Sequence, residues 1–93
     1  MYAVFTEVNA DESHLEAGRR FLSEMAVPMV KDHGAKAAYW LAPQDGRGVS
    51  VVVFETEDEA RKAAEPLKVG DQAGPTPEVT FRTVEVREVI ASL

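Results

Sequence analysis

The sequence predicts a single α+β domain over residues 1–93, with a four-stranded antiparallel sheet and two helices on one of its faces. Three observations support this prediction. Residues 36–55 read as two strands joined by a tight polar turn. Two outer stretches, 2–8 and 78–90, alternate along their length as strands do. Between these strands lie two segments whose apolar residues recur at steps of three and four, as in helices. A chain of this length holds one domain.

The first helix follows the first strand after a polar break at residues 9–11. Its start is ambiguous, because Asp11 is a good N-cap and Ser13 with Glu16 also matches the S-x-x-E capping box. Gly34 predicts its end, since glycine adopts the left-handed conformation at a helix C-terminus without penalty. Both starts stay open, and the helix is expected to stop at Gly34.

Each predicted helix contains a proline. Pro28 removes a backbone donor and clashes with the preceding turn, so we expect a kink or a break near residues 24–28. The second helix begins with a T-x-x-E capping box formed by Thr56 and Glu59. Its apolar positions are mostly alanine, which predicts close packing against the sheet. Pro66 makes the end of this second helix uncertain.

The central hairpin indicates that the sheet is covered on both faces. Its turn contains Asp45-Gly46, a strong turn dipeptide. Residues 49–54 form an almost unbroken apolar strand, which is typical of a strand that is buried on both faces. The helices of one small domain cover only one face of its sheet. We therefore expect a homodimer formed through the sheet face, in which a second copy covers the other side.

A long loop separates the second helix from the last strand. Residues 69–77 contain two glycines and two prolines, and the loop is long enough to form a flap over a pocket. The last strand, residues 78–90, is long for a four-stranded sheet. We expect it to extend past its own sheet and reach the partner subunit, which would protect the exposed edge.

Composition excludes several classes of protein. The net charge is −6, whereas a nucleic-acid-binding surface is basic. The chain has no cysteine, so it has no disulfide framework and no cysteine nucleophile. No apolar run approaches the roughly 20 residues that span a bilayer, and the N-terminus does not read as a signal peptide. We expect a cytoplasmic protein that binds neither nucleic acid nor membranes.

The order β-α-β-β-α-β is that of ferredoxin-like folds. This order, the chain length and the segments AAYWL, GRGVSVVVFET and EDEARKAA resemble the dimeric α+β-barrel superfamily. Within it, the chain most resembles the antibiotic-biosynthesis-monooxygenase-type domains, especially small actinobacterial members. The resemblance covers nearly the whole chain. It implies a homodimeric barrel in which two four-stranded sheets face each other, with a pocket between each sheet and its helices.

Three residues are candidates for a catalytic site. Asn9 resembles the asparagine that several monooxygenase members place in the pocket to hydrogen-bond a substrate or an oxyanion; the alternative is a turn residue. Trp40 resembles their pocket tryptophan, and the alternative is a large core residue. Tyr39 points to the opposite side of the strand, so it cannot share a pocket with Trp40. His14 is the one histidine that could reach a pocket containing Asn9, and the alternative is a surface position.

The resemblance implies two functions that the sequence leaves open. The first is a cofactor-independent monooxygenase acting on a small aromatic or polyketide-like compound. The second is a non-catalytic dimer of the same fold that binds a small ligand or serves in a stress response. Whether the protein is an enzyme is therefore left open. In both cases the expected partner besides the second copy is a small apolar or aromatic ligand.

No cofactor or metal site is expected. His14 and His33 bracket the first helix and lie about 28 Å apart along a straight helix, so they cannot ligate one metal within a subunit. Haem-degrading members of the superfamily use a histidine of the second helix as axial ligand, and this chain has none there. The acidic residues at 55–59 are better explained by capping of the second helix than by metal binding.

Overall fold

The computed structural model describes residues 1–93 and has the predicted order of strands and helices. The elements are β1 (Tyr2–Asn9), a short 3₁₀ turn η1 (Glu12–His14), α1 (Leu15–Phe21), a π-helical turn η2 (Leu22–Ala26), α2 (Val27–Asp32), β2 (Ala37–Gln44), β3 (Arg47–Phe54), α3 (Glu57–Ala64) and β4 (Thr80–Glu88). The strands form one antiparallel sheet in the order β2-β3-β1-β4. This arrangement is compatible with a ferredoxin-like fold.

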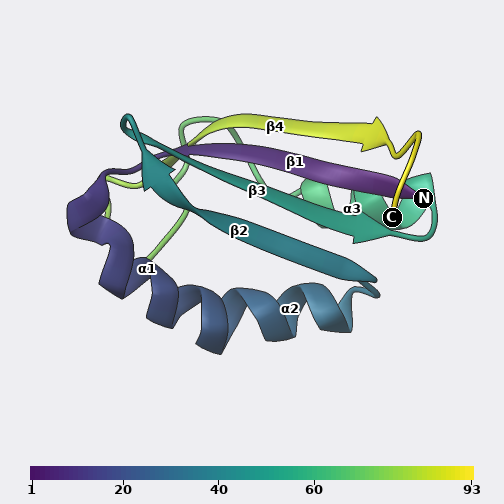
Figure 1. Cartoon of the computed structure of the whole chain (residues 1–93), viewed down its shortest axis with the longest axis horizontal. Coiled ribbons are helices and arrows are strands. Elements are labelled where there is room, and N and C mark those ends of the chain that lie inside the picture. The colour runs from purple at the N-terminus through teal and green to yellow at the C-terminus, as the bar shows by residue number, and fades with distance from the viewer.

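Both helical layers lie on the same side of the sheet, and the opposite face is open (Figure 1). α3 packs directly on β1, β3 and β4. Its mostly alanine face allows this close approach, as predicted, and Ala60 and Phe54 have no exposed surface. Val4 and Val52 complete the fully apolar core cluster. The main core therefore sits under α3, over the two central strands β1 and β3.

The helical stretch from α1 to α2 is continuous but irregular. The irregularity predicted before Pro28 is present as the π-helical turn η2, where the Val27 N–H donates to the Leu22 carbonyl five residues back. π-helical turns of this kind occur mostly inside α-helices, where they insert one residue into the α-helical pattern. The helix continues through Pro28 into α2 rather than ending there. Neither this stretch nor α3 has the length and hydrophobicity that would let it traverse a lipid bilayer.

The start of the first helix is at Asp11, not at Ser13. The Asp11 carboxylate accepts the Ser13 backbone N–H at 2.9 Å, and the His14 ring accepts the Asp11 backbone N–H, which completes a capping box. The second predicted box is present as the sequence indicates. The Thr56 hydroxyl accepts the Glu59 N–H at 3.2 Å, and the Glu59 carboxylate accepts the Thr56 N–H at 3.2 Å.

The hairpin turn contains fewer residues than the polar segment 43–48, which the sequence indicates as the turn. The strands continue to Gln44 and from Arg47, which leaves a two-residue turn. Asp45 and Gly46 have φ angles of 56° and 76°, and two positive φ angles are what a type I′ turn requires. The register of β2 shifts between Leu41 and Gln44, where a proline interrupts this edge strand.

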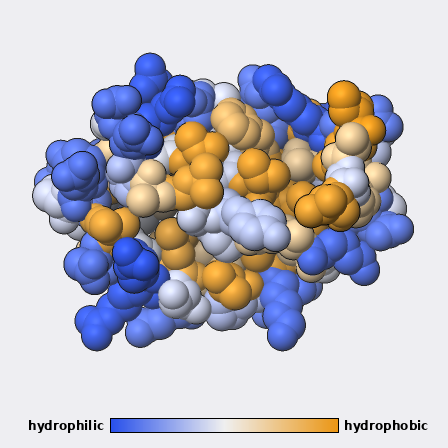
Figure 2. All heavy atoms as spheres, in the orientation of Figure 1, coloured by the Kyte–Doolittle hydropathy of each residue, from blue (hydrophilic) through white to orange (hydrophobic).

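The two faces of β3 differ in burial. Its helix-side residues, such as Ser50 and Val52, are buried, whereas Val49, Val51 and Val53 on the open face are half-buried. We predicted that both faces of this strand are buried. In the single chain, only the helix-side face is buried. Figure 2 shows the open face, where a hydrophobic band crosses the centre and hydrophilic side chains surround it.

The last strand is shorter than predicted. β4 pairs with β1 from Thr80 to Glu88, and Glu88 lies opposite Tyr2 at the beginning of β1. The Val89 N–H donates to the Met1 carbonyl at 2.9 Å, after which the chain leaves the sheet and Ile90 is 92% exposed. The strand thus ends level with its neighbour, and the prediction that it extends past its own sheet is wrong.

Gly34 closes the first helix and lies against the second. Its φ angle is 92°, and the Ala35 N–H donates to the Val30 carbonyl at 3.0 Å, as in a Schellman motif. A Cβ atom at Gly34 would lie 2.9 Å from the Glu59 carboxylate, the same group that caps α3. The end of one helix and the beginning of the other are therefore in contact through this glycine.

Gly34→Ala is expected to lower the free energy of unfolding by about 1–2 kcal/mol, because it combines a strained φ with displacement of a capping carboxylate. The matched control is Gly18→Ala, where the added Cβ meets nothing within 4 Å inside a helix. That control is expected to raise the free energy of unfolding by about 0.5–1 kcal/mol. Urea unfolding followed by circular dichroism measures both, and equal effects of the two substitutions would contradict this account.

Candidate functional site

A cavity of about 630 Å³ lies between the helix-side face of the sheet and the first helical stretch. α3 packs closely on the strands, whereas the stretch from α1 to α2 stands off from them. Small residues face the gap from both sides, among them Ala17 and Gly18 from the helix and Gly48 from β3. Because these residues cannot fill the space that larger side chains would occupy, the cavity stays open. Its lining is mostly apolar.

A row of three side chains forms the sheet wall of this cavity. Trp40 of β2 lies opposite Ser50 of β3, and Ser50 lies opposite Thr6 of β1. All three line the cavity. The Thr6 and Ser50 hydroxyls are hydrogen-bonded at 2.5 Å and are among the few buried polar groups of the chain. When one hydroxyl donates to the other, the acceptor keeps its own proton, so the pair can donate one hydrogen bond to a ligand.

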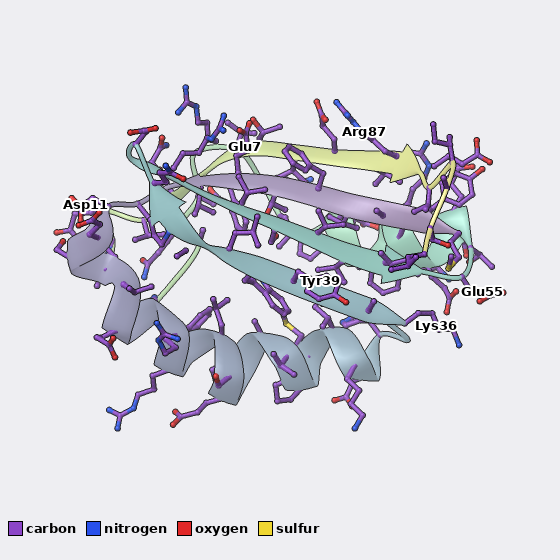
Figure 3. The ribbon with its side chains drawn as sticks, in the orientation of Figure 1. Glu7, Asp11, Lys36, Tyr39, Glu55 and Arg87 are labelled. Atoms are coloured by element: carbon purple, nitrogen blue, oxygen red, sulfur yellow. The ribbon has the colours of Figure 1, made fainter.

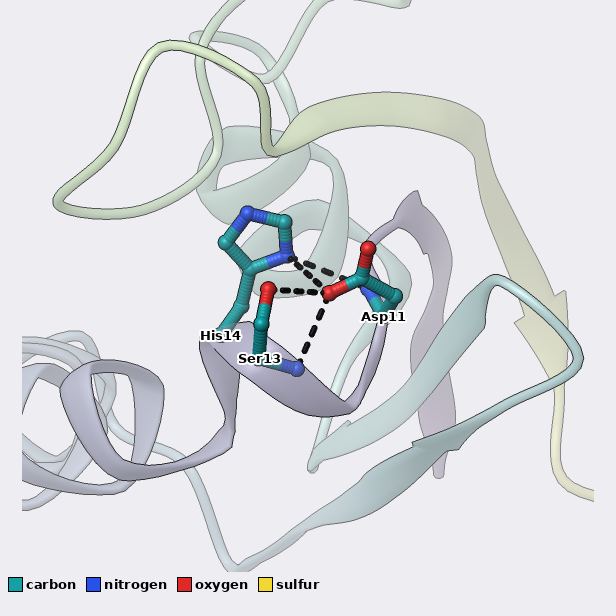
Figure 4. A network of polar contacts seen from close by, with 3 residues as sticks. All are labelled: Asp11, Ser13 and His14. Carbon is teal, nitrogen blue, oxygen red and sulfur yellow. Dashed lines mark hydrogen bonds and ion pairs between the residues drawn. The ribbon is translucent and has the colours of Figure 1, made fainter.

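The helix cap holds His14 (Figure 4), and His14 lines the cavity. The His14 Nδ1 accepts the Asp11 backbone N–H at 3.1 Å and lies 3.2 Å from the Asp11 carboxylate. The Ser13 hydroxyl and the Ser13 N–H both donate to the same Asp11 oxygen. These Ser13 hydrogen bonds, with a smaller contribution from His14, lower the pKa of Asp11 from its ordinary value of 3.8.

The loop before β4 covers part of the cavity, as the sequence predicts for a flap. Residues 72–76 line the cavity, and the loop is tied to the beginning of β4 by main-chain hydrogen bonds. One is the Ala73 N–H to the Val79 carbonyl at 2.8 Å, and Gln72 forms a β-bridge with Thr80. The Thr76 hydroxyl is buried and has no hydrogen-bond partner within the chain. The flap therefore contributes part of the cavity lining, and the unpartnered Thr76 hydroxyl is enclosed within it.

The structure brings two of the three candidate residues together. Trp40 and His14 line the same cavity, whereas Asn9 is exposed and lies outside its lining. The Asn9 amide donates to the Thr80 hydroxyl at 3.2 Å, across β1 and β4. Tyr39 points away from Trp40, as the alternation of the strand predicts, and lies on the open face with 66% of its surface exposed (Figure 3). The catalytic roles of Asn9, Trp40 and His14 remain predictions.

Five polar residues of the cavity were not recognised from the sequence: Thr6, Arg19, Ser50, Gln72 and Thr76. Thr6 and Ser50 left a weak signal, because each is a polar residue at an otherwise apolar position of a buried strand. Their pairing depends on strand register and could not be read locally. No group of three or more His, Asp or Glu side chains is placed to hold a metal ion.

No protein-family model, curated protein or solved structure matches this chain. The resemblance to the dimeric α+β-barrel superfamily therefore stays a prediction that rests on short sequence segments and on the order of elements. The observed sheet and its two helical layers are compatible with that superfamily's fold but do not identify it. Function has to be argued from the side chains around the cavity.

Thr6→Val is expected to lower the free energy of unfolding by about 1–3 kcal/mol, because it leaves the Ser50 hydroxyl buried without its partner. The double variant Thr6→Val with Ser50→Ala removes both hydroxyls and is expected to recover most of that loss. Chemical unfolding of the two single variants and the double variant measures the coupling. Additive losses would show that the two hydroxyls do not stabilise each other.

The lowered pKa of Asp11 predicts a pH dependence of stability. A depressed pKa means that the carboxylate stabilises the folded state above the ordinary value of 3.8, and that this contribution is lost as pH falls through the folded pKa. Asp11→Asn keeps an N-cap side chain that does not titrate. The difference in unfolding free energy between the natural chain and Asp11→Asn should therefore begin to change as pH falls below about 5 and continue to change through the folded pKa. A difference that stays constant as pH falls through 3.8 would contradict this assignment.

Proposed function

We propose that this protein binds a small, largely apolar aromatic or polyketide-like compound in the cavity between the sheet and the first helical stretch. The observation that carries this proposal is the cavity itself, about 630 Å³ in volume with a mostly apolar lining and a few polar groups. Cavities of this size and composition are typical of small-molecule sites.

The lining supports a ligand with a flat apolar body and at least one polar group. The Trp40 indole offers an aromatic surface beside the Thr6 and Ser50 hydroxyls. Polar groups also stand at the flap and at the helix cap, where Thr76 and His14 line the cavity. An aromatic compound lying along Trp40 could satisfy these groups while its body covers the apolar wall.

Cofactor-free monooxygenation is the reaction that such a site would support. In that reaction an activated methylene loses a proton, the resulting carbanion or phenolate passes an electron to dioxygen, and the two radicals combine. One oxygen atom remains as a carbonyl and the other leaves as water, so the four electrons lost by the methylene reduce one dioxygen. Trp40 would orient the substrate and His14 would stabilise the developing oxyanion. Asn9 lies outside the cavity, so this proposal rests on the other two candidates.

The alternative is a non-catalytic ligand-binding or stress-response protein of the same fold. It is favoured by the small number of titratable groups in the cavity, where only His14 and Arg19 carry an ionisable side chain. The binding proposal is common to both functions. They differ in whether dioxygen is consumed.

We also propose that a second copy of this chain covers the open face of the sheet. The half-buried valines of β3, together with Tyr39 and Leu41 of β2, form its apolar centre. Paired charges lie beside this centre, with Glu7 bonded to Arg47 at 2.8 Å and Arg87 bonded to Glu85 at 2.8 Å. The Glu7 and Arg87 side chains lie along the upper strands in Figure 3. An apolar centre with charged groups beside it is the usual composition of a protein–protein interface.

Anthrone, an aromatic ketone with an activated methylene, tests binding and reaction together. Binding is expected to change the fluorescence of Trp40, the only tryptophan, and oxygenation to consume one dioxygen per anthraquinone formed. Gly18→Leu places a side chain in the cavity and is expected to weaken binding at least about tenfold, whereas Gly18→Ala serves as the control. Binding without oxygen uptake above the uncatalysed rate would select the non-catalytic alternative. Binding unaffected by Gly18→Leu would contradict the proposed site.

Leu41→Asp tests the dimer. Leu41 is 61% exposed in a single chain, so a charge there is expected to leave the fold intact and to prevent association through the sheet face. Sedimentation velocity at micromolar concentration is expected to give a dimer for the natural chain and a monomer for the variant. The control is Glu24→Gln, a surface change on the helical stretch. A natural chain that sediments as a monomer would contradict the proposed interface.

A further inference from the structure

We propose that the helix cap fixes His14 as a hydrogen-bond donor to the cavity, and that the ligand carries an anionic oxygen which this donor recognises. The proposal deepens the ligand-binding function and rests on it. Three observations carry it: the hydrogen bond to one ring nitrogen, the position of the other, and the sign of the charges in the cavity lining.

The first observation fixes the tautomer. The Asp11 backbone N–H donates to the His14 Nδ1 at 3.1 Å, so this nitrogen must offer its lone pair. A neutral imidazole has one donor nitrogen and one acceptor nitrogen. The proton of neutral His14 therefore lies on Nε2. The same cap also holds the Asp11 side chain, which accepts the Ser13 N–H and the Ser13 hydroxyl.

The second observation is the direction of Nε2. In Figure 4 the Nδ1 atom faces Asp11, and Nε2 lies on the far side of the ring. The His14 side chain is only 21% exposed and lines the cavity. A proton on Nε2 is thus available to a cavity ligand while Nδ1 is engaged in the cap.

Protonation does not reverse this role. An imidazolium carries a proton on both nitrogens, and the Asp11 carboxylate lies 3.2 Å from Nδ1, where it would accept that second proton. The Nε2 atom therefore carries a proton in both charge states. It follows that His14 cannot take a proton from the ligand through Nε2. In the monooxygenase scheme it would stabilise the oxyanion, and a different group or solvent would remove the substrate proton.

The third observation is the charge of the lining. The chain has a net charge of −6, yet the cavity lining contains two basic side chains, His14 and Arg19, and no Asp or Glu. One further donor lies in the lining, since the Thr6 and Ser50 pair retains one free O–H. Such a lining favours a phenolate, an enolate or a carboxylate on an otherwise apolar body.

Two measurements test the proposal. Long-range ¹H–¹⁵N correlation spectra of the natural chain, above the pKa of the imidazoles, report which ring nitrogen carries the proton. We expect His14 to be the Nε2–H tautomer, and the exposed His33 gives a reference for an unconstrained ring. A dominant Nδ1–H tautomer at His14 would overturn the proposal whether or not any ligand binds.

The second measurement compares 4-nitrophenolate with nitrobenzene, which has the same ring without the anionic oxygen. The natural chain is expected to prefer the phenolate, and His14→Leu is expected to reduce that preference about tenfold while nitrobenzene affinity changes little. His14→Gln keeps an acceptor for the cap and an amide donor, so it should retain part of the preference even if the leucine variant folds poorly.

Arg19→Gln separates the two basic groups. This variant is expected to keep most of the phenolate preference, because the Arg19 side chain is 67% exposed and its charge is screened by solvent. A preference lost in Arg19→Gln and kept in His14→Leu would overturn the role of His14. Failure of both probes to bind the natural chain would instead overturn the ligand-binding function, while the tautomer measurement would still stand on its own.

Discussion

Phe54 and Ala60 hold α3 against the sheet with no exposed surface, and the rest of the structure depends on this contact. It places the apolar core between α3 and the central strands β1 and β3, where alanines allow close approach. No comparable contact draws the first helical stretch onto β2 and β3. The asymmetry between a helix that packs closely and one that stands off creates the cavity. Small residues in its lining, such as Gly18, leave part of this space unfilled.

Because few side chains are buried, the stability of the fold depends on covering more apolar surface. Only 11 of the 93 residues are buried in the single chain, which is few for a stable core. Two apolar surfaces remain uncovered, the cavity wall and the open face of the sheet. A ligand in the cavity would stabilise the native state by binding it in preference to the unfolded chain, and so would a second copy on the open face of the sheet. The two proposed partners therefore supply the burial that the chain lacks.

The cap of the first helix connects local structure to the cavity. Asp11, Ser13 and His14 satisfy backbone groups at the helix start, and the same hydrogen bonds orient the imidazole. The cap therefore has a structural role and a chemical one. Negative charge is concentrated at exposed positions, and the cavity lining holds only basic and neutral groups. This separation of charge lets the site favour an anionic ligand although the chain has a net negative charge.

The sequence by itself determined the features that depend on local chemistry. The Asp45-Gly46 turn, the Thr56 cap, the left-handed Gly34 and the opposite directions of Trp40 and Tyr39 all follow from residue type and alternation. These predictions were confirmed because each involves groups within a few residues of one another. The position of the π-helical turn was likewise indicated by the proline that follows it.

Only the tertiary structure decided which side chains meet. The Thr6 and Ser50 pair lies 44 residues apart in the chain and depends on strand register. The direction of Asn9 away from the cavity and the end of β4 level with β1 were likewise set by neighbouring strands. The choice of His14 over Glu16 as the cap partner depends on where the helix starts. The cavity depends on the sizes of side chains from several elements at once. Such features arise from long-range packing, which the local pattern of residues does not encode.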